Sequence, residues 1–311
     1  MRKTYRKGKA MLDICLLGCG GMTPLPDRRL TSMLIRQNGK MILVDCGEGT
    51  QIGIRSLGWG FKSIEALCLT HYHADHIAGL PGFLLTLGNC GRTDPFIICG
   101  PPPLDYVISA LTVIAPQLPF DIQLVELSEQ EESEYQIGEF FIKAIPMDHR
   151  IPCLSYSIEI KRAGRFERNR AEEQGIPLEF WNVLQKGDTV FYQGRNLTPD
   201  MVVGPPRKGL KVTYCTDSRP TNELIEFAGG SDLLILEGMY GDEALLDKAV
   251  VRKHMIFSEA AVIAARSKSK ELWLTHFSPS MKTPEEFLPF VLDIFPNTMI
   301  GRDLLTTQLN F

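Results

Sequence analysis

The sequence predicts a sandwich of two β-sheets covered by helices, and three observations lead to this fold class. Short apolar and β-branched runs, bounded by Gly, Pro and Asp, recur along all 311 residues. Segments with helical spacing of apolar residues lie between some of these runs, but strands outnumber helices. The two classes also alternate irregularly, which favours a two-sheet sandwich over a doubly wound single sheet.

The predicted strands begin with the first apolar run of the chain and continue to its last residue. They comprise residues 11–18, 32–37, 40–47, 65–70, 95–100, 140–147, 153–160, 211–217, 232–238, 271–277 and 304–311. Five segments show the spacing of an amphipathic helix. These are residues 74–87, 104–114, 243–250, 257–266 and 284–294.

Two parts of the chain depart from this rhythm. Residues 1–10, MRKTYRKGKA, are basic and no apolar segment follows that would make them a secretory signal. We expect a disordered basic tail there, ahead of a single domain over residues 11–311. From Lys161 to Gly209 the sequence predicts no regular strands and is rich in polar, Gly and Pro residues. We expect an inserted flexible arm, about residues 161–204, that projects from the core.

The composition limits the possible functions. No apolar run approaches the ~20 residues that a membrane span needs, so we expect no membrane association. The eight cysteines include no CxxC pair, and several lie inside apolar strands, as reduced cysteines usually do. We therefore expect a cytoplasmic protein. The net charge of −4 gives no global attraction to nucleic acid, so such a partner would need a local basic patch.

Three of the six histidines lie in the short stretch THYHADH, where a predicted strand ends and a predicted helix begins. Side chains on such a turn can converge. Neutral imidazole and carboxylate suit zinc, and this spacing can divide into two pairs that face two adjacent ions. The candidate ligands on this turn are His71, His73, Asp75 and His76.

Two pairs leave both ions short of ligands, and His149, Asp217 and His276 each stand where a further apolar run stops. A carboxylate such as Asp217 can bridge two cations and hold them ~3.5 to 4 Å apart. Each residue alone has another explanation: His149 and His276 as surface or core histidines, and Asp217 as a helix N-cap. The strand-end position that His149 and His276 share favours metal ligation for them. For the THYHADH cluster a non-metal role is disfavoured, because burying three imidazoles and a carboxylate without a cation is costly.

The HxHxDH pattern with its later His, Asp and His resembles the metallo-β-lactamase superfamily. The resemblance implies an α+β fold, a four-layer αββα sandwich with a dinuclear site between the sheets. Within the superfamily, HADHIAGLPGFLLTLGNCGR, VDCGEGTQ, GPPRKGLKVTYCTDSRP and LTHFSPS are similar to ribonuclease Z, the endonuclease that trims precursor tRNA at its 3′ end. This implies a zinc-dependent endoribonuclease with precursor tRNA as its partner, and we expect a homodimer.

The resemblance also implies roles for individual residues. His71, His73 and His149 would hold one zinc ion, and Asp75, His76 and His276 the other, with Asp217 bridging; manganese or iron tolerate the same ligands. His254 matches the family's catalytic histidine and would protonate the leaving 3′ oxygen or stabilise charge on the phosphate. Glu237 would orient His254, although an ordinary strand-end glutamate explains it nearly as well. Asp75 would also take a proton from the attacking water.

The segment Lys161–Gly209 holds nine basic and six acidic residues, a net charge of +3, which leaves −7 for the remainder. A basic projection on an acidic body suits a phosphate backbone, although a solvated charged loop is the alternative. The resemblance implies that this arm clasps tRNA, and the candidate substrate-binding residues are Arg165, Arg168, Arg170 and Lys208. Four aromatic residues would either pack the arm or stack on bases: Phe166, Phe180, Trp181 and Tyr192.

Two other functions are compatible with these residues. One is a small-molecule metallo-hydrolase of the same fold, of the arylsulfatase or cyclic phosphodiesterase type. The other is a metal-bearing RNA-binding protein without turnover. The basic arm and the stretch GPPRKG favour the nuclease over the first, and the presence of His254 disfavours the second.

Overall fold

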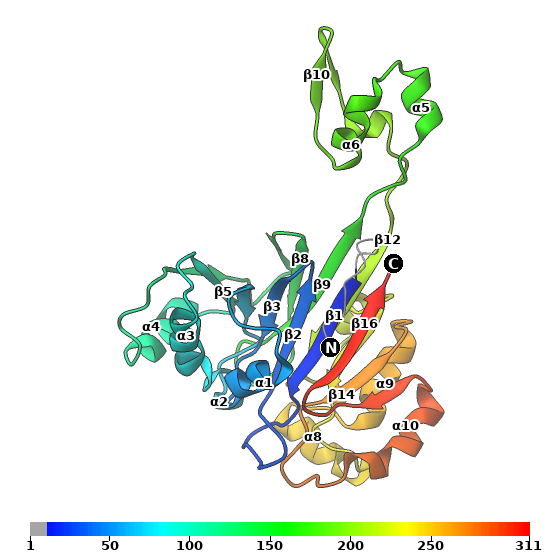
Figure 1. Ribbon diagram of the computed structural model, residues 1–311. Helices are drawn as coiled ribbons and strands as arrows, with labels where there is room; N and C mark the ends of the chain where they lie inside the picture. Colours follow the sequence, from blue (N-terminus) through cyan, green and yellow to red (C-terminus); the bar gives the residue numbers. More distant parts are fainter. Residues whose placement is uncertain (1–10) are drawn as a thin grey trace. The chain divides into compact units, whose positions relative to one another are not determined.

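The computed structural model describes residues 11–311 (Figure 1), so the predicted basic tail lies outside the described residues. Residues 11–159 and 211–311 form one compact unit, here called the large unit. Residues 160–210 form a second compact unit, here called the insertion.

The first sheet of the large unit has seven strands in the order β16-β1-β2-β3-β4-β5-β6. Strands β16, β1, β2 and β3 pair antiparallel, whereas β3, β4, β5 and β6 pair parallel. The carboxyl ends of β3 and β4 therefore lie at the same edge of the sheet. The strands are β1 (Met11–Gly18), β2 (Ser32–Gln37), β3 (Lys40–Val44), β4 (Ile64–Cys68), β5 (Phe96–Gly100), β6 (Ile122–Glu126) and β16 (Leu305–Asn310).

The second sheet also has seven strands, in the order β15-β14-β13-β12-β9-β8-β7. Strands β12, β13, β14 and β15 pair parallel, which brings the carboxyl ends of β12, β13 and β14 to one edge. The strands are β7 (Ser133–Ile137), β8 (Phe140–Pro146), β9 (Leu154–Arg162), β12 (Arg207–Cys215), β13 (Leu233–Glu237), β14 (Leu272–Thr275) and β15 (Thr298–Ile300).

Helices cover the outer face of each sheet. Those of the first half share a buried core with β1–β5, and those of the second half share one with β12–β14 (Figure 1). In the described part of the chain, no helix is long and apolar enough to cross a membrane. The helices are α1 (Thr50–Leu57), α2 (Ala74–Ile77), α3 (Leu80–Asn89), α4 (Leu104–Thr112), α7 (Asn222–Phe227), η2 (Glu243–Leu245), α8 (Leu246–Arg252), α9 (Phe257–Arg266), η3 (Pro284–Phe287) and α10 (Leu288–Ile294).

Both faces of each sheet are buried, as a four-layer sandwich requires. In β1, Cys15 and Leu17 belong to the core under the helices, yet the alternate residues Ile14 and Leu16 are also fully buried. Successive side chains of a strand point to opposite faces, so the second set faces the other way. The predicted two-sheet sandwich with outer helices is confirmed.

Some predicted elements differ from those observed. The single helix expected over residues 74–87 is two helices, because Gly79 interrupts it. The Gly79 N–H donates to the Cys46 carbonyl at 2.9 Å, and a Cβ at Gly79 would lie 2.3 Å from the Gly47 oxygen. Strands β6 and β7 escaped prediction because both are partly exposed and rich in polar residues.

The insertion has a small core of its own. Ala171, Ile176, Leu184, Leu197 and Val202 are buried there. The four aromatic side chains singled out above pack against this core and pair with each other, Phe166 with Trp181 and Phe180 with Tyr192. Its elements are α5 (Arg168–Glu173), α6 (Leu178–Gln185), β10 (Val190–Tyr192), β11 (Arg195–Leu197) and η1 (Pro199–Met201).

Candidate active site

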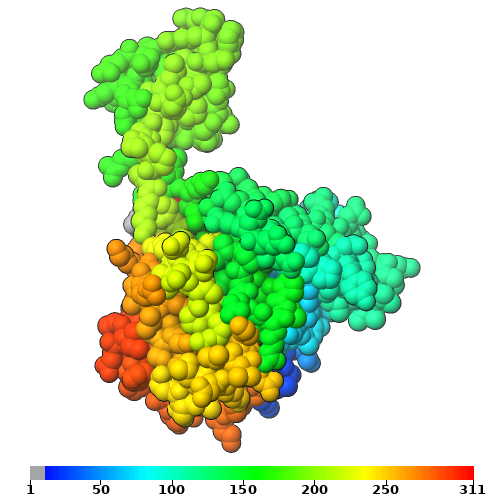
Figure 2. Space-filling view, turned by 180° about the vertical axis from the view of Figure 1, so that it is seen from behind, coloured from blue at the N-terminus to red at the C-terminus, as the bar shows by residue number. Residues whose placement is uncertain are grey.

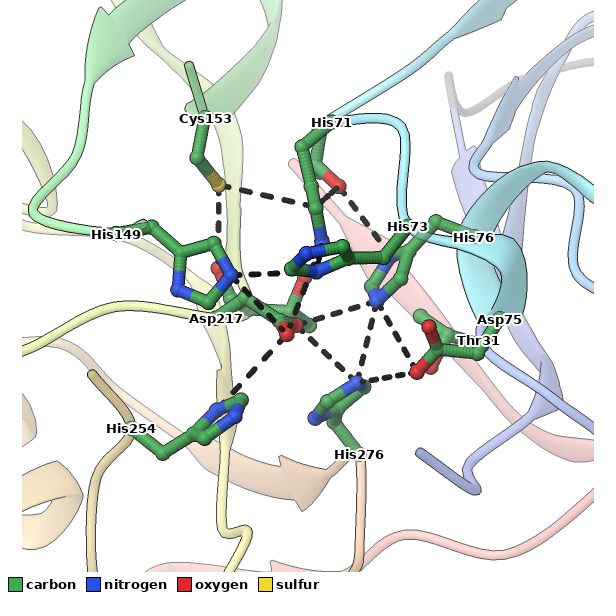
Figure 3. A network of polar contacts seen from close by, with 12 residues as sticks. Thr31, His71, His73, Asp75, His76, His149, Cys153, Asp217, His254 and His276 are labelled. Carbon is green, nitrogen blue, oxygen red and sulfur yellow. Dashed lines mark hydrogen bonds and ion pairs between the residues drawn. The ribbon is translucent and has the colours of Figure 1, made fainter. Parts of the chain in front are cut away.

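The seven candidate metal ligands converge at the edge of the large unit where the parallel strands end (Figure 3). His71, His73, Asp75 and His76 follow β4, and Asp217 and His276 follow β12 and β14. His149 follows β8. Several of these side chains line a cavity of about 660 Å³. Residues more than 200 positions apart in the chain thus meet because sheet geometry brings their strand ends together.

The donor atoms form two groups, here together called the donor cluster. Within each group, all donor atoms lie within 4.8 Å of one another. The first group is His71, His73, His149 and Asp217, and the second is Asp75, His76 and His276.

The carboxylate of Asp217 presents one oxygen to each group. Its Oδ1 lies 3.2 Å from His76 Nε2 and 3.1 Å from His276 Nε2. Its Oδ2 lies 3.7 Å from His71 Nε2 and 3.9 Å from His149 Nε2. This arrangement is the one that a carboxylate needs to bridge two cations.

The spacing of the ring nitrogens fits metal coordination. His71 Nε2 lies 2.9 Å from His73 Nδ1, which lies 3.3 Å from His149 Nε2. In the second group, His76 Nε2 and His276 Nε2 are 3.1 Å apart. Nitrogens bound at about 2.0–2.1 Å to a tetrahedral zinc ion lie about 3.3 Å from each other. The donor set therefore has the types and spacing that a divalent metal requires.

The outer nitrogens of these rings are held by partners that leave the inner nitrogens free to ligate. His76 Nδ1 lies 2.8 Å from Asp45 Oδ2, and His149 Nδ1 lies 3.2 Å from the Lys253 carbonyl. His71 Nδ1 lies 3.0 Å from Thr70 Oγ1. The Asp45 carboxylate and the Lys253 carbonyl can only accept, so in these two pairs the ring N–H donates and the opposite nitrogen presents its lone pair to the centre. The Thr70 hydroxyl donates to Asp45, which leaves its oxygen able to accept from His71.

Orphaned buried atoms support the same conclusion. Among the described residues, Asp217 Oδ1 and His276 Nδ1 have no hydrogen-bond partner, although both are buried. Asp217 Oδ1 lies instead against two imidazole nitrogens, those of His76 and His276. A buried carboxylate oxygen without a hydrogen bond is costly unless a cation compensates it.

Electrostatics divide the imidazoles into neutral and charged members. Burial lowers the pKa of His71 well below its usual value, and burial also lowers the pKa of His149. Burial opposes the charge on His76, but the Asp217 and Asp45 carboxylates raise its pKa well above the usual value. A cation bound at His76 Nε2 would replace the proton that these carboxylates otherwise retain.

Asp75 is positioned by the loop after β1. The Met22 N–H donates to Asp75 Oδ2 at 2.6 Å, and His276 Nε2 lies 3.3 Å from the same oxygen. Burial favours its neutral form, but the hydrogen bond to His276 and the charge of His76 hold the pKa of Asp75 well below its usual value. Gly21 is needed beside it, because a Cβ there would lie 2.7 Å from the His276 ring.

Three residues of this edge adopt left-handed backbone conformations. Asp45, Asp217 and His276 have φ values of 56°, 55° and 56°. Each stands directly after a strand or one residue beyond it, where the turn aims the side chain back toward the neighbouring strand ends. Non-glycine residues in this region carry strain that is typical of functional sites.

His254 lies beside the donor cluster and is held by Glu237. Its Nδ1 lies 3.0 Å from Glu237 Oε2, and Glu237 Oε1 accepts from the Ser218 N–H at 2.6 Å. His254 Nδ1 also lies 3.8 Å from Asp217 Oδ2, so His254 could join a third group of donors. The shorter contact to Glu237 occupies this nitrogen, which leaves Nε2 for a substrate.

The charge of Glu237 controls the protonation of His254. Burial lowers the pKa of His254, but the Glu237 carboxylate outweighs burial and raises it to about 9. A histidine that is protonated at neutral pH and held by a carboxylate is equipped to donate a proton.

The loop that carries His254 is anchored by Arg219. The guanidinium of Arg219 donates to the His254 carbonyl and forms an ion pair with both carboxylate oxygens of Glu259. Glu259 Oε2 also accepts from the Ile256 N–H at 3.1 Å. Asp217 and His254 are thereby tied together through Arg219, two residues after Asp217.

The predicted substrate-binding residues belong to the insertion. Arg168 forms an ion pair with Glu172 at 2.6 Å, and Arg170 forms one with Glu167 at 3.4 Å. Part of the positive charge of this unit is thus offset locally, although these pairs are exposed and weak. The full set is Arg165, Arg168, Arg170 and Lys208.

Some residues of the site escaped the sequence analysis. Asp45 follows β3 as the candidate ligands follow their strands, but its stretch, VDCGEGTQ, served only for the family resemblance. The strand-end rule applies to Asp45 as well, since the predicted strands over residues 211–217 and 271–277 likewise run through Asp217 and His276. Arg219 carried no such signal, because its partner Glu259 lies 40 residues further along the chain.

Comparison with known proteins identifies the family. Residues 26–234 match the model of the metallo-beta-lactamase superfamily. The chain is 54% identical over 301 residues to Ribonuclease Z of Agathobacter rectalis, an alignment that covers 97% of this chain and 99% of that protein. The chain belongs to the ribonuclease Z family of this superfamily. Ribonuclease Z of Clostridium acetobutylicum is 51% identical, with 97% of this chain and 99% of that protein covered.

Solved structures agree on the fold of this ribonuclease Z family member. The short form of human tRNase Z superimposes with a TM-score of 0.69 at 23% identity, covering 95% of this chain and 98% of that one. The metallo-beta-lactamase fold protein YhfI from Bacillus subtilis gives the same TM-score at 18% identity, covering 97% and 100%. The predicted fold, the predicted family and the prediction of a hydrolase are confirmed.

Proposed function

We propose that the chain is a zinc-dependent endoribonuclease that cleaves precursor tRNA at its 3′ end, after the discriminator nucleotide. The observation that carries the proposal is the donor cluster, in which Asp217 faces two groups of ligands beside the His254–Glu237 pair. More than half of the residues are shared with a protein named Ribonuclease Z, which favours the same substrate.

In this proposal His71, His73 and His149 hold one cation, Asp75, His76 and His276 hold the other, and Asp217 bridges. Two such cations lower the pKa of water and offset the negative charge of a phosphodiester. Zinc suits the imidazole and carboxylate donors, although manganese or iron tolerate them as well. Metal analysis of protein purified without chelators should find about two transition-metal ions per chain. One or none in folded protein would contradict the proposal.

The residues around the cations divide the proton transfers. Asp75, an ionised carboxylate with its Oδ2 on the Met22 N–H, accepts a proton from the attacking water. His254, protonated and held at Nδ1 by Glu237, donates a proton from Nε2 to the leaving 3′ oxygen. An acid and a base with separated pKa values, on either side of one cavity, suit hydrolysis near neutral pH.

The insertion supplies binding in this proposal. Its net charge of +3 attracts a phosphate backbone without reading sequence, and Arg165, Arg168, Arg170 and Lys208 are the proposed contacts. The aromatic residues of the insertion pack its own core, so they contribute rigidity more than stacking on bases.

The deciding experiment compares precursor tRNA with bis(p-nitrophenyl) phosphate as substrates of the full chain. The structure suggests a clean deletion of residues 165–203, because the Gly204 N–H donates to the Arg165 carbonyl at 2.8 Å and Gly164 lies against Gly204. We expect one cut in the RNA, which the deletion abolishes while hydrolysis of the small ester persists. Rapid ester turnover without RNA cleavage would support the small-molecule hydrolase instead. RNA binding without turnover of either substrate would support a binding protein.

Two further features belong to the proposal. We propose a homodimer, because Ile52 of α1 and Leu85 of α3 are 59% and 41% exposed on neighbouring helices. Light scattering of the wild type and of Ile52→Glu/Leu85→Glu would test it, and a monomeric wild type would contradict it. We also propose a cytoplasmic location, since all eight cysteines are free and seven are buried, as in a reducing compartment.

A further inference from the structure

Three basic side chains lie on one wall of the active-site cavity, outside the donor cluster. They are Arg150, in the loop after β8, and Lys248 and Arg252 of α8. All three are exposed, and the α8 segment, gold in Figure 2, forms part of the surface of the large unit. We call them the basic wall.

The basic wall carries charge that the protein itself does not neutralise. Within residues 11–311, none of the three side chains forms an ion pair. Their neighbour Lys253 differs in two ways. Its Nζ forms an ion pair with Asp148 Oδ2 at 2.9 Å, and Lys253 does not line the cavity. Uncompensated cations that share a cavity repel one another, so such a group favours an anionic ligand.

Tyr240 connects the basic wall to the catalytic histidine. Lys248 Nζ lies 4.8 Å from the centre of the Tyr240 ring, and this ring meets the His254 ring edge to face at 6.4 Å. Arg150 and Arg252 line the same cavity as Tyr240. Arg150 Nη2 also donates to the Val251 carbonyl at 3.1 Å, so its guanidinium is fixed against α8.

On the side of His254, the lining of the cavity therefore continues through Tyr240 to Lys248. In the proposed reaction, His254 protonates the 3′ oxygen that leaves, and this oxygen belongs to the nucleotide upstream of the cut. The cations proposed at the donor cluster would offset the negative charge of the phosphate that is cleaved. A second phosphate placed beyond His254 is the one that carries the RNA upstream.

We propose that Arg150, Lys248 and Arg252 form a binding site for the RNA phosphate immediately 5′ to the nucleotide that carries the leaving oxygen. The inference rests on the proposed function and adds to it a direction for the RNA in the cavity. Contacts to phosphate position a nucleic acid without reading its sequence, which suits an enzyme that accepts many tRNAs.

The test removes the charge on the protein side and on the RNA side separately. Precursor tRNA is prepared with a single neutral methylphosphonate, either at the phosphate 5′ to the discriminator nucleotide or at the phosphate one nucleotide into the trailer. The enzymes are the wild type and Lys248→Ala/Arg252→Ala, whose substituted side chains are exposed and so leave the core unchanged. Arg150 is kept, because it adjoins His149.

We expect the upstream methylphosphonate to lower kcat/KM of the wild type by about 10- to 100-fold, the scale of a charge-assisted hydrogen bond. The double variant should lose a similar factor on unmodified RNA and lose little more with the upstream methylphosphonate. The double variant should also reduce the slope of log K against log salt concentration for RNA binding by about 1, the contribution of one phosphate. Independent losses, or coupling to the trailer phosphate instead, would overturn the inference.

A matched control and a second substrate separate this inference from the proposed function. Lys62→Ala, at the far end of β4 from the donor cluster, should behave as the wild type. Trinucleotides with and without a 5′-phosphate offer the upstream phosphate without tRNA structure, and the wild type should prefer the phosphorylated one. That preference, lost in the double variant, supports the site even if precursor tRNA is not cleaved, an outcome that would refute only the proposed function. Cleavage of precursor tRNA without any such coupling would refute only the site.

Discussion

The donor cluster and the insertion differ in how their residues are distributed along the chain and in how rigidly those residues are held. The residues of the donor cluster come from positions 71–276 and are mostly buried, and each of His71, His76 and His149 is fixed by an outer partner. The insertion is built from 51 consecutive residues, Ile160–Leu210, around a small core, and its charges are exposed. Metal chemistry needs atoms placed within tenths of an ångström, which only the packed strand ends provide. Attraction of a polyanion needs charge more than exact position.

The largest expected effect comes from replacing Asp217, whose carboxylate faces both groups of the donor cluster. Asp217→Ala should lose both cations and all measurable hydrolysis, of RNA and of bis(p-nitrophenyl) phosphate alike, because one oxygen of Asp217 faces each donor group. Binding of tRNA should persist through the insertion. Metal content, turnover and RNA affinity measured on one preparation test this, with Asp105→Asn on α4 as the control. Retention of two metal ions by Asp217→Ala would contradict the bridging role of Asp217.

The next effect separates chemistry from metal binding inside the site. His254→Ala should keep its metal content and lower the turnover rate by roughly 10²- to 10⁴-fold, the scale of a lost general acid. His76→Ala should lower metal content as well as rate, because its Nε2 belongs to the second donor group. Loss of metal from His254→Ala, or full activity in it, would show that the proton comes from elsewhere.

A smaller effect concerns pH. Glu237 raises the pKa of His254, and the protonated form is the donor, so activity is present below that pKa and is lost as pH rises through it. Glu237→Gln removes the charge, lowers the pKa of His254 and should move the alkaline limb of the kcat profile to lower pH. Glutamine can still accept from the Ser218 N–H, so the fold should hold. An unmoved limb, equal to that of the exposed control Glu243→Gln, would exclude Glu237 from this role.

The smallest effect on chemistry should come from the core of the insertion. Leu184 is fully buried there, and Leu184→Ala should destabilise this unit by about 2–5 kcal/mol. We expect a several-fold rise in KM for precursor tRNA, with the hydrolysis of the small ester unchanged. Leu178→Ala, a 73% exposed neighbour in α6, serves as the control. Equal losses of activity on both substrates would mean that the insertion affects hydrolysis itself as well as RNA binding.

Sequence reasoning selected the residues that the structure brings together in the donor cluster, because their signal is local. His71, His73, Asp75 and His76 share one turn, and each remaining candidate ligand follows an apolar run that the chain marks clearly. The fold class followed from the same runs. Asp45 satisfies the same strand-end rule but was not singled out, because its contact with His76 joins residues 31 positions apart in the chain.

The rest depended on packing that no local pattern records. Gly79 breaks a predicted helix because the backbone of Gly47 approaches it, and these two residues are 32 positions apart. The basic wall joins Arg150 to two residues of α8 roughly a hundred positions later, so its charges do not form a run in the sequence. The aromatic residues of the insertion allowed two interpretations, and only their contacts with Leu184 and its neighbours favoured packing.

Asp217 and His276 each combine a left-handed backbone with a buried atom that has no hydrogen-bond partner among the described residues. The backbone alone costs about 1–3 kcal/mol at each position, a large share of the ~5–15 kcal/mol that keeps a protein folded. Glycine at position 217 would relieve both defects in protein without metal. A library of variants selected for heat resistance under chelation should therefore enrich glycine there and yield hardier, inactive chains. At position 217, glycine thus favours the stability of the metal-free protein, whereas aspartate favours catalysis. Bound metal stabilises the folded protein, so a supply of metal allows evolution to retain both stability and activity.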